Sequence, residues 1–190
     1  NNRPEVLAAD MLAQAEHDKL ACAVLITDSE SLALAVSSAL EAQLKRLPRQ
    51  EIARAAIENR SRIIITESLD EAVELANEIA PEHLEICLDQ PFAWLEKVKN
   101  AGSIFLGRSC PEPMGDYFAG TNHTLPTGGT ARFSGGLSVE DFVKASSYMY
   151  YTEEALRQDA EKVACFAEQE GLHAHAVSAT IRLKSEGRRP

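Results

Sequence analysis

The residues of this sequence best suited to chemistry are five histidines and the acids and amides near them. Gln14 and His17 lie three apart in a predicted helix, so their side chains project from one face. Such a pair could hold a metal ion, although glutamine is an uncommon zinc ligand. The same residues also suit an ordinary polar helix end, where His17 would favour the C-terminal dipole. The spacing alone leaves both interpretations open.

A second candidate is the adjacent pair Glu82 and His83, which follows Pro81 at the start of a predicted strand. An acid and an imidazole side by side can divide proton transfers near one substrate. In a parallel sheet, however, the start of a strand is not the usual edge for an active site. A surface Glu-His pair is the ordinary alternative, so a catalytic role needs support from elsewhere.

Two further segments carry polar groups in unusual density. Residues 114–127 place Asp116 and His123 among threonines and glycines, and a structural turn would need the glycines but not these polar side chains. This favours a functional loop. Farther on, Glu170 precedes His173 and His175. A His-x-His spacing is only a weak metal signal by itself.

The elements that must position these residues alternate between strands and helices. The apolar runs 21–27 and 62–66 predict strands buried on both faces. Further strands are expected at 82–88 and 103–106, and helices at 5–17, from about 28 to 47, 50–59, from 68 onward, and 91–100. This order predicts an α/β fold with an incomplete, Rossmann-like, mostly parallel sheet and flanking helices.

The alternation stops at Gly107. Residues 107–137 are rich in glycine and have no helical period, but their aromatic side chains argue against disorder. Helices alone are expected afterwards, at about 139–151, 153–169 and 173–184. We therefore predict an α/β domain over 1–137, with 107–137 as its active-site loop, and a helical tail over 138–190. A tail without a sheet of its own favours docking on a partner.

Composition narrows the functional classes. The net charge of -10 argues against a nucleic-acid or anionic-membrane partner. The four cysteines form no Cys-x-x-Cys and predict reduced thiols, and no stretch has the pattern of a membrane span or a signal peptide, so a cytoplasmic location is expected. The chain opens on Asn1 rather than methionine, as a cut or trimmed polypeptide would.

Taken together, the candidate residues occur in an order that resembles histidinol dehydrogenase. The matching segments are Gln14-Ala15-Glu16-His17, Ala80-Pro81-Glu82-His83-Leu84, Gly102-Ser103-Ile104-Phe105-Leu106-Gly107, Gly115-Asp116-Tyr117 through Pro126, and the Glu170 to His175 spacing. Each match is weak alone, but the ordered set spans nearly the whole chain and is specific.

The resemblance implies the oxidation of L-histidinol to L-histidine by way of L-histidinaldehyde, the last step of histidine biosynthesis, with two NAD molecules reduced in turn. It implies one zinc ion per subunit, held by Gln14, His17, Asp116 and His175, with the substrate's imidazole and amino groups completing the shell. Zinc would then anchor and orient the substrate more than activate water.

The resemblance also implies roles for the other residues. His83 corresponds to the general base and Glu82 to the residue that activates water, while His123 and Glu170 correspond to substrate contacts. Gln14, His17, His83, Asp116 and His175 would also bind substrate. His173 corresponds to no ligand.

An assembly follows as well: a homodimer with an exchanged tail, in which Glu170 and His175 serve the other subunit. The resemblance implies that the family's nucleotide-binding part lies N-terminal to this sequence, and no Gly-x-Gly-x-x-Gly occurs here. NAD contacts are therefore unassigned, and the chain alone is expected to be inactive. Two alternatives remain open: a zinc-dependent hydrolase in which Glu82 polarises metal-bound water, and a dimerising module with an empty site.

Overall fold

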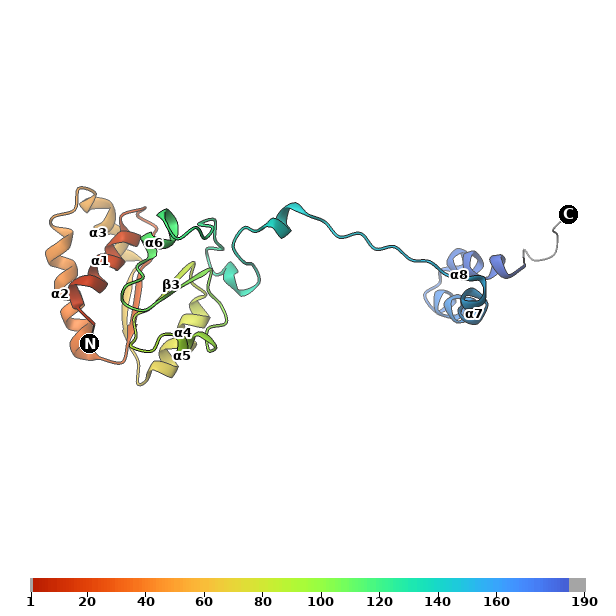
Figure 1. The fold of residues 1–190 in the computed structure, drawn as a ribbon, viewed down its shortest axis with the longest axis horizontal. Helices are drawn as coiled ribbons and strands as arrows, with labels where there is room; N and C mark the ends of the chain where they lie inside the picture. The colour runs from red at the N-terminus through yellow and green to blue at the C-terminus, as the bar shows by residue number, and fades with distance from the viewer. Residues whose placement is uncertain (1, 185–190) are drawn as a thin grey trace. The chain divides into compact units, whose positions relative to one another are not determined.

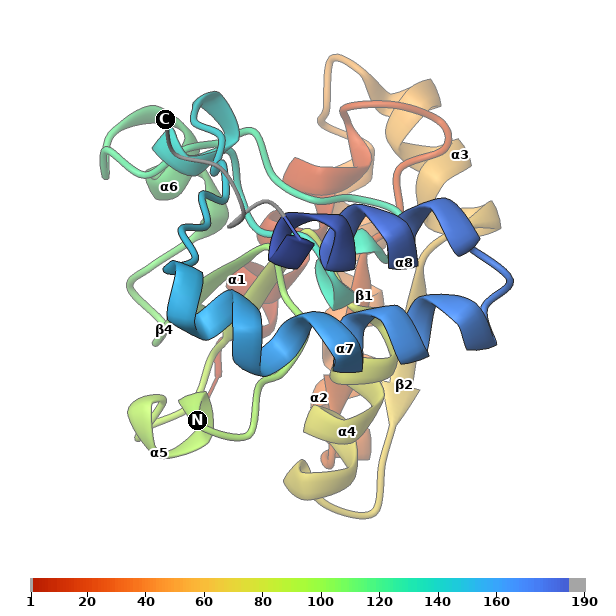
Figure 2. The same ribbon diagram turned by 90° about the vertical axis from the view of Figure 1, so that its right-hand side faces the viewer.

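The computed structural model describes residues 2–184 and divides into two compact units, Asn1–Val143 and Lys144–Pro190 (Figures 1 and 2). The first unit holds the helices and strands of the α/β part. In chain order these are α1 (Pro4–Ala15), β1 (Val24–Thr27), α2 (Glu30–Leu44), α3 (Gln50–Asn59), β2 (Arg62–Ile65), α4 (Leu69–Ile79), β3 (His83–Ile86), α5 (Phe92–Leu95), β4 (Ser103–Leu106) and α6 (Glu112–Tyr117). Two short 3-10 turns follow, Thr130–Arg132 and Val139–Phe142.

The strands pair in parallel, which confirms the predicted α/β class. Leu25 of β1 lies opposite Ile63 of β2, and Leu84 of β3 lies opposite Ile104 of β4. The described residues form two separate two-stranded sheets, however, where one sheet was expected. Strands this few leave edges unpaired, so the prediction that 62–66 is buried on both faces is wrong: Ile65 is 52% exposed.

The main core lies between α1, α2 and α3. Leu12 of α1, Val36 and Leu44 of α2, and Ala53 and Ala56 of α3 are all buried in it. Ser29 caps the start of α2: its side chain accepts a hydrogen bond from the backbone N–H of Leu32.

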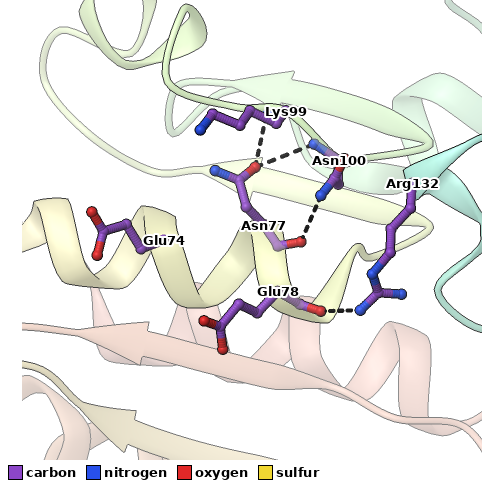
Figure 3. A pocket seen from close by; sticks show the side chains of 6 residues that line it. All are labelled: Glu74, Asn77, Glu78, Lys99, Asn100 and Arg132. Carbon is purple, nitrogen blue, oxygen red and sulfur yellow. Dashed lines mark hydrogen bonds between the residues drawn. The ribbon is translucent and has the colours of Figure 1, made fainter.

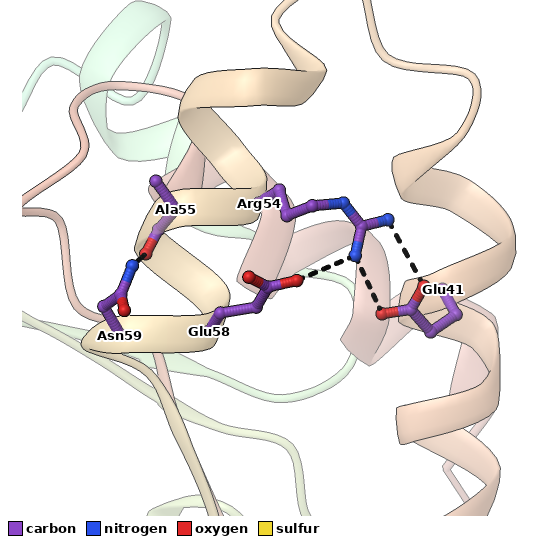
Figure 4. Close-up of polar contacts among 5 residues, drawn as sticks. All are labelled: Glu41, Arg54, Ala55, Glu58 and Asn59. Atoms are coloured by element: carbon purple, nitrogen blue, oxygen red, sulfur yellow. Dashed lines mark hydrogen bonds and ion pairs between the residues drawn. The ribbon is translucent and has the colours of Figure 1, made fainter.

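The outer faces of α2 and α3 are tied by a surface ion pair. Arg54 of α3 lies 3.3 Å from Glu41 of α2 and 3.0 Å from Glu58 of its own helix, and Asn59 bonds back to the Ala55 carbonyl (Figure 4). Exposed pairs of this kind contribute about 0–1 kcal/mol. The buried apolar side chains therefore decide how firmly α1, which carries Gln14, is held.

The predicted helix over 91–100 is largely wrong, because only the four residues of α5 are helical. Beyond α5, the side chain of Asn77 on α4 holds the end of the predicted helix in a non-helical conformation. Its Oδ1 accepts the backbone N–H groups of Lys99 and Asn100, at 2.6 and 3.2 Å, and Asn100 returns a bond to the Asn77 carbonyl (Figure 3). Side-chain bonds of this type compete with helix formation.

The glycine-rich segment 107–137 is less irregular than its composition predicts. It contains α6, which begins after Pro111 and runs for six residues. A helix shorter than two turns shows no 3.6-residue period, so the sequence pattern could not reveal it. Arg132 of the same segment donates a hydrogen bond to the Glu78 carbonyl at the end of α4 (Figure 3). Arg132 and Glu78, with polar residues of α4 and of the chain at 99–100, border a cavity of about 570 Å³.

The second unit is helical. α7 (Glu153–Gln169) follows the N-cap Thr152 and α8 (His173–Thr180) follows Gly171, whose φ of +74° suits glycine; a 3-10 turn, Ile181–Lys184, comes last. The predicted helix over 139–151 is wrong beyond the 3-10 turn at 139–142, since residues 143–151 form no helix and are all exposed. Most helices in proteins depend on an apolar face that is buried, and this segment buries none.

Within the described part of the chain no helix combines the length and the apolar character needed to cross a membrane.

We predict that Leu44→Ala lowers the free energy of unfolding by about 2–5 kcal/mol, because it leaves a cavity at a fully buried core position. Leu34→Ala on the same helix is the matched control, since Leu34 is 64% exposed and should change stability by less than about 0.5 kcal/mol. Urea unfolding followed by circular dichroism measures both. Equal losses in the two variants would contradict the assignment of the core.

Candidate active and metal site

The pair Glu82 and His83 enters the fold through a constrained turn. Ala80, the residue that follows α4, is buried and has the left-handed φ of 52°, which costs a non-glycine residue roughly 1–2 kcal/mol. The backbone N–H groups of Gly102 and Ser103 then donate to the Pro81 and Glu82 carbonyls, at 2.9 and 2.8 Å. A Cβ at position 102 would lie 2.6 Å from the Glu82 oxygen, so only glycine allows this approach.

The side chain of His83 is half-buried, and its Nε2 atom is fully buried. Its Nε2 atom has no hydrogen-bond partner among the described residues, and the nearest charged group is the Glu112 Oε1 atom, 3.6 Å away. The ring lies 6.0 Å from the Phe105 ring in a tilted arrangement. A buried polar atom left without a partner costs free energy, so its retention points to a missing ligand or substrate group.

Two acids of α6 face this imidazole. Glu112 and Asp116 are four residues apart, and their carboxylate oxygens and a ring nitrogen of His83 all lie within 4.8 Å of one another. Burial, followed by repulsion from Asp116, raises the pKa of Glu112 to about 7. Groups this close repel as anions, and a cation or a shared proton between them would relieve the repulsion.

Glu112 was missed by the sequence analysis. The signal that could have found it is Pro111 followed by acids at 112 and 116, since proline often precedes or opens a helix and residues four apart share a helical face.

The position of α6 depends on a contact with β4. Gly115 is buried, and a Cβ there would lie 2.7 Å from the Phe105 ring. The absence of a side chain at 115 therefore lets α6 approach the ring, and this approach sets where Asp116 lies.

His17 and His123, two other predicted residues of the first unit, are not part of the His83 cluster. Gln14 is half-buried near the end of α1, whereas His17 is exposed just beyond it, and its carbonyl accepts a bond from Arg49. His123 is exposed in the loop after α6.

Glu170 and His175 belong to the second unit, where both are exposed. They border a hollow of about 470 Å³ whose other lining includes the apolar side chains of Val163, Phe166 and Leu172. His173 is bonded instead to Glu168, with its Nδ1 atom 2.6 Å from the carboxylate. This local partner is consistent with the prediction that His173 holds no ligand.

Comparison with known proteins assigns the chain to a family. The family model described as histidinol dehydrogenase matches residues 1–183. The chain belongs to the histidinol dehydrogenase family. It is 56% identical over 182 residues to the histidinol dehydrogenase of Geobacillus kaustophilus and 53% identical over 184 residues to that of Carboxydothermus hydrogenoformans. These matches cover 96% and 97% of this chain and 43% of each relative, so the chain spans less than half of their length.

A solved structure agrees. The crystal structure of histidinol dehydrogenase from Elizabethkingia anophelis matches with a TM-score of 0.85 and 37% identity, covering 98% of this chain and 43% of that one. The resemblance inferred from the ordered motifs is therefore confirmed at the level of the family.

The donor groups fit the divalent metal that the family resemblance implies. Asp116 offers a carboxylate in a half-buried acidic cluster, and His17 and His175 offer imidazole nitrogens. Zinc commonly binds imidazole nitrogens together with a smaller number of carboxylate oxygens. The excess of acid beside His83 also favours a cation, because two carboxylates in a partly desolvated site need compensation.

We predict that Gly115→Ala destabilises the chain by about 1–3 kcal/mol, because the new methyl group would overlap the Phe105 ring. Helix propensity alone predicts the opposite sign, a gain of about 1 kcal/mol. Gly135→Ala, where a Cβ meets nothing within 4 Å, is the matched control and should leave stability unchanged. Urea unfolding decides; a Gly115→Ala variant as stable as its control would mean that α6 is not seated on Phe105.

Proposed function

We propose that this chain forms the metal-binding and proton-handling part of a zinc-requiring, NAD-dependent histidinol dehydrogenase. The reaction is the oxidation of L-histidinol to L-histidine through L-histidinaldehyde, the last step of histidine biosynthesis, and we place it in the cytoplasm. The observation that carries the proposal is the buried, unpartnered Nε2 atom of His83 beside Glu112 and Asp116, in a chain of this family.

Zinc, one ion per subunit, would be held by Gln14, His17, Asp116 and His175, and when bound it supplies an electrophilic anchor that orients the substrate. The same residues, together with His83, His123 and Glu170, form the proposed substrate site. Asp116 lies next to His83, so a substrate held at the metal would present its reacting end to the imidazole.

His83 is the proposed general base. Its Nε2 atom takes the proton of the substrate hydroxyl while the carbon bearing that hydroxyl loses a hydride. Glu82 takes a proton from water, so that the water oxygen can attack the aldehyde carbon before the second hydride is lost. Neighbouring residues within a strand point to opposite faces, but Glu82 lies in the bend before β3 and is free of that alternation. Both groups are therefore able to serve one substrate.

Glu112 has a proposed part in holding this base. With its Oε1 atom 3.6 Å from Nε2, it lies close enough to stabilise the imidazolium that forms when His83 takes a proton.

NAD, when bound, accepts the hydride in each oxidation. The described residues contain no glycine-rich strand-to-helix turn suited to a pyrophosphate, so we assign no NAD contact to them.

The helical unit is the proposed element of dimer exchange. It buries mainly alanines, Ala160, Ala167 and Ala176, while Phe166 is 71% and Ile181 56% exposed. We propose that this apolar surface docks on a second copy of the chain, where Glu170 and His175 complete the partner's substrate and zinc site. The net charge of -10 supports neither a nucleic-acid nor an anionic-membrane partner.

The roles of Glu82 and His83 predict different kinetic defects in the purified natural polypeptide. His83→Asn should slow NADH formation from L-histidinol by about 10²–10⁴-fold. Glu82→Gln should retain the first oxidation but lose NADH formation from L-histidinaldehyde by a similar factor. His173→Asn is the control and should match the wild type, because His173 is already bonded to Glu168. Equal defects on both substrates in Glu82→Gln would refute the division of labour, and hydrolysis without oxidation would favour a zinc hydrolase instead.

The metal assignment predicts that His175→Ala loses tight zinc binding while the α/β unit stays folded, because His175 lies in the other unit. His173→Ala on the same helix is the matched control and should keep its zinc. Metal content by atomic emission and folding by far-ultraviolet circular dichroism measure the two effects. Stoichiometric zinc retained in His175→Ala would rule this ligand out.

A further inference from the structure

The carboxyl group of Glu85 joins three elements of the first unit. Glu85 lies in β3, two residues after His83, so both side chains leave the same face of the strand. Its Oε1 atom accepts the backbone N–H of Glu112, the first residue of α6, at 2.8 Å. The carboxyl group of Asp10 on α1 lies beside it, close enough for the two groups to share a hydrogen bond. One side chain thus connects the strand of the proposed base with the helices carrying Gln14 and Asp116.

A hydrogen bond between two carboxyl groups requires a proton. Asp10 and Glu85 are both partly buried, and burial raises the pKa of each, that of Glu85 to about 7. The groups that influence the pKa of Glu85 include no cation. The Cys87 thiol lies 3.9 Å from its carboxyl group and Glu112 is acidic, while the positive charge of Arg108 lowers the pKa of Cys87 instead. Two ionised carboxylates here would repel, so one proton held between them is the stable arrangement.

We propose that Asp10 and Glu85 share one proton and so clamp α1 to the first residue of α6, which positions Gln14 and His17 relative to Asp116. The proposal rests on the metal roles given to those three residues above. Asp10 and Glu85 are positioning residues: they act on the ligands through the helices that carry them, as outer partners of metal sites do.

The experiment compares zinc affinity in three variants of the natural polypeptide, measured with the metal alone by competition with a chelator. Glu85→Gln keeps an acceptor for the Glu112 N–H and a donor for Asp10, so its affinity should stay within about threefold of wild type. Glu85→Ala removes the clamp and should weaken zinc by about 10–100-fold. Glu74→Ala, an exposed acid on α4, is the matched control and should change nothing.

A double-variant cycle separates a clamp from a general loss of stability. Asp10→Ala alone should also weaken zinc, but adding it to Glu85→Ala should cause no further loss, since the bond is already broken. Additive losses would overturn the proposal. So would equal weakening by Glu85→Gln and Glu85→Ala, or wild-type affinity in Glu85→Ala.

Two measurements on the zinc-free protein test the Asp10–Glu85 interaction independently of the proposed metal role. Infrared spectroscopy at pH 6 should show a stronger band of protonated carboxyl groups in wild type than in Glu85→Gln, because Glu112 contributes to the band in both proteins and the shared proton only in wild type. Hydrogen exchange at the Glu112 amide should be slow in wild type and Glu85→Gln, and at least tenfold faster in Glu85→Ala. A wild type that binds no zinc would refute the proposed metal role. Unchanged exchange at Glu112 in Glu85→Ala would refute the clamp itself.

Discussion

The candidate site depends on the first rung of the β3–β4 pair. The N–H groups of Gly102 and Ser103 hold the Pro81 and Glu82 carbonyls, and the missing side chain at 102 allows the two backbones to approach. Because β4 also supplies Phe105, the same strand that fixes the backbone of the Glu82–His83 pair seats Gly115 of α6. One strand, β4, therefore positions both His83 and the acids of α6, which restricts changes in the distance between them.

This arrangement explains why a polar cluster can form at the start of a strand, where the rule for parallel sheets disfavours an active site. That rule reflects open sheets in which loops gather beyond the carboxyl ends of the strands. Here β4 ends at Leu106, and the chain returns through α6 to the side of His83. The returning helix, rather than the strand end, brings the acids to the imidazole.

Sequence patterns predicted the elements that are stabilised locally. α3 and α7 have the predicted bounds, 50–59 and 153–169, and Thr152 caps α7 by accepting the Ala155 N–H. Patterns failed where a distant side chain intervenes, as when Asn77 accepts the backbone N–H groups of Lys99 and Asn100, which the sequence pattern had placed in a helix. Within the site, the ordered motifs pointed to His83 and Asp116. The burial of the His83 Nε2 atom and the participation of Glu112 depend on tertiary packing, which spacing does not encode.

The division of the proposed ligands between two units has an energetic consequence. The helical unit buries alanines and leaves Phe166 and Ile181 exposed, so its own packing returns little of the conformational entropy lost on ordering it. Under the proposed exchange, docking on a second copy would supply the missing burial, and His175 would reach the metal only in the docked state. Anything that binds the docked form stabilises it by mass action, so zinc affinity and dimer affinity become linked and each must strengthen the other. Under this proposal, zinc binding also shifts the equilibrium toward the assembled dimer.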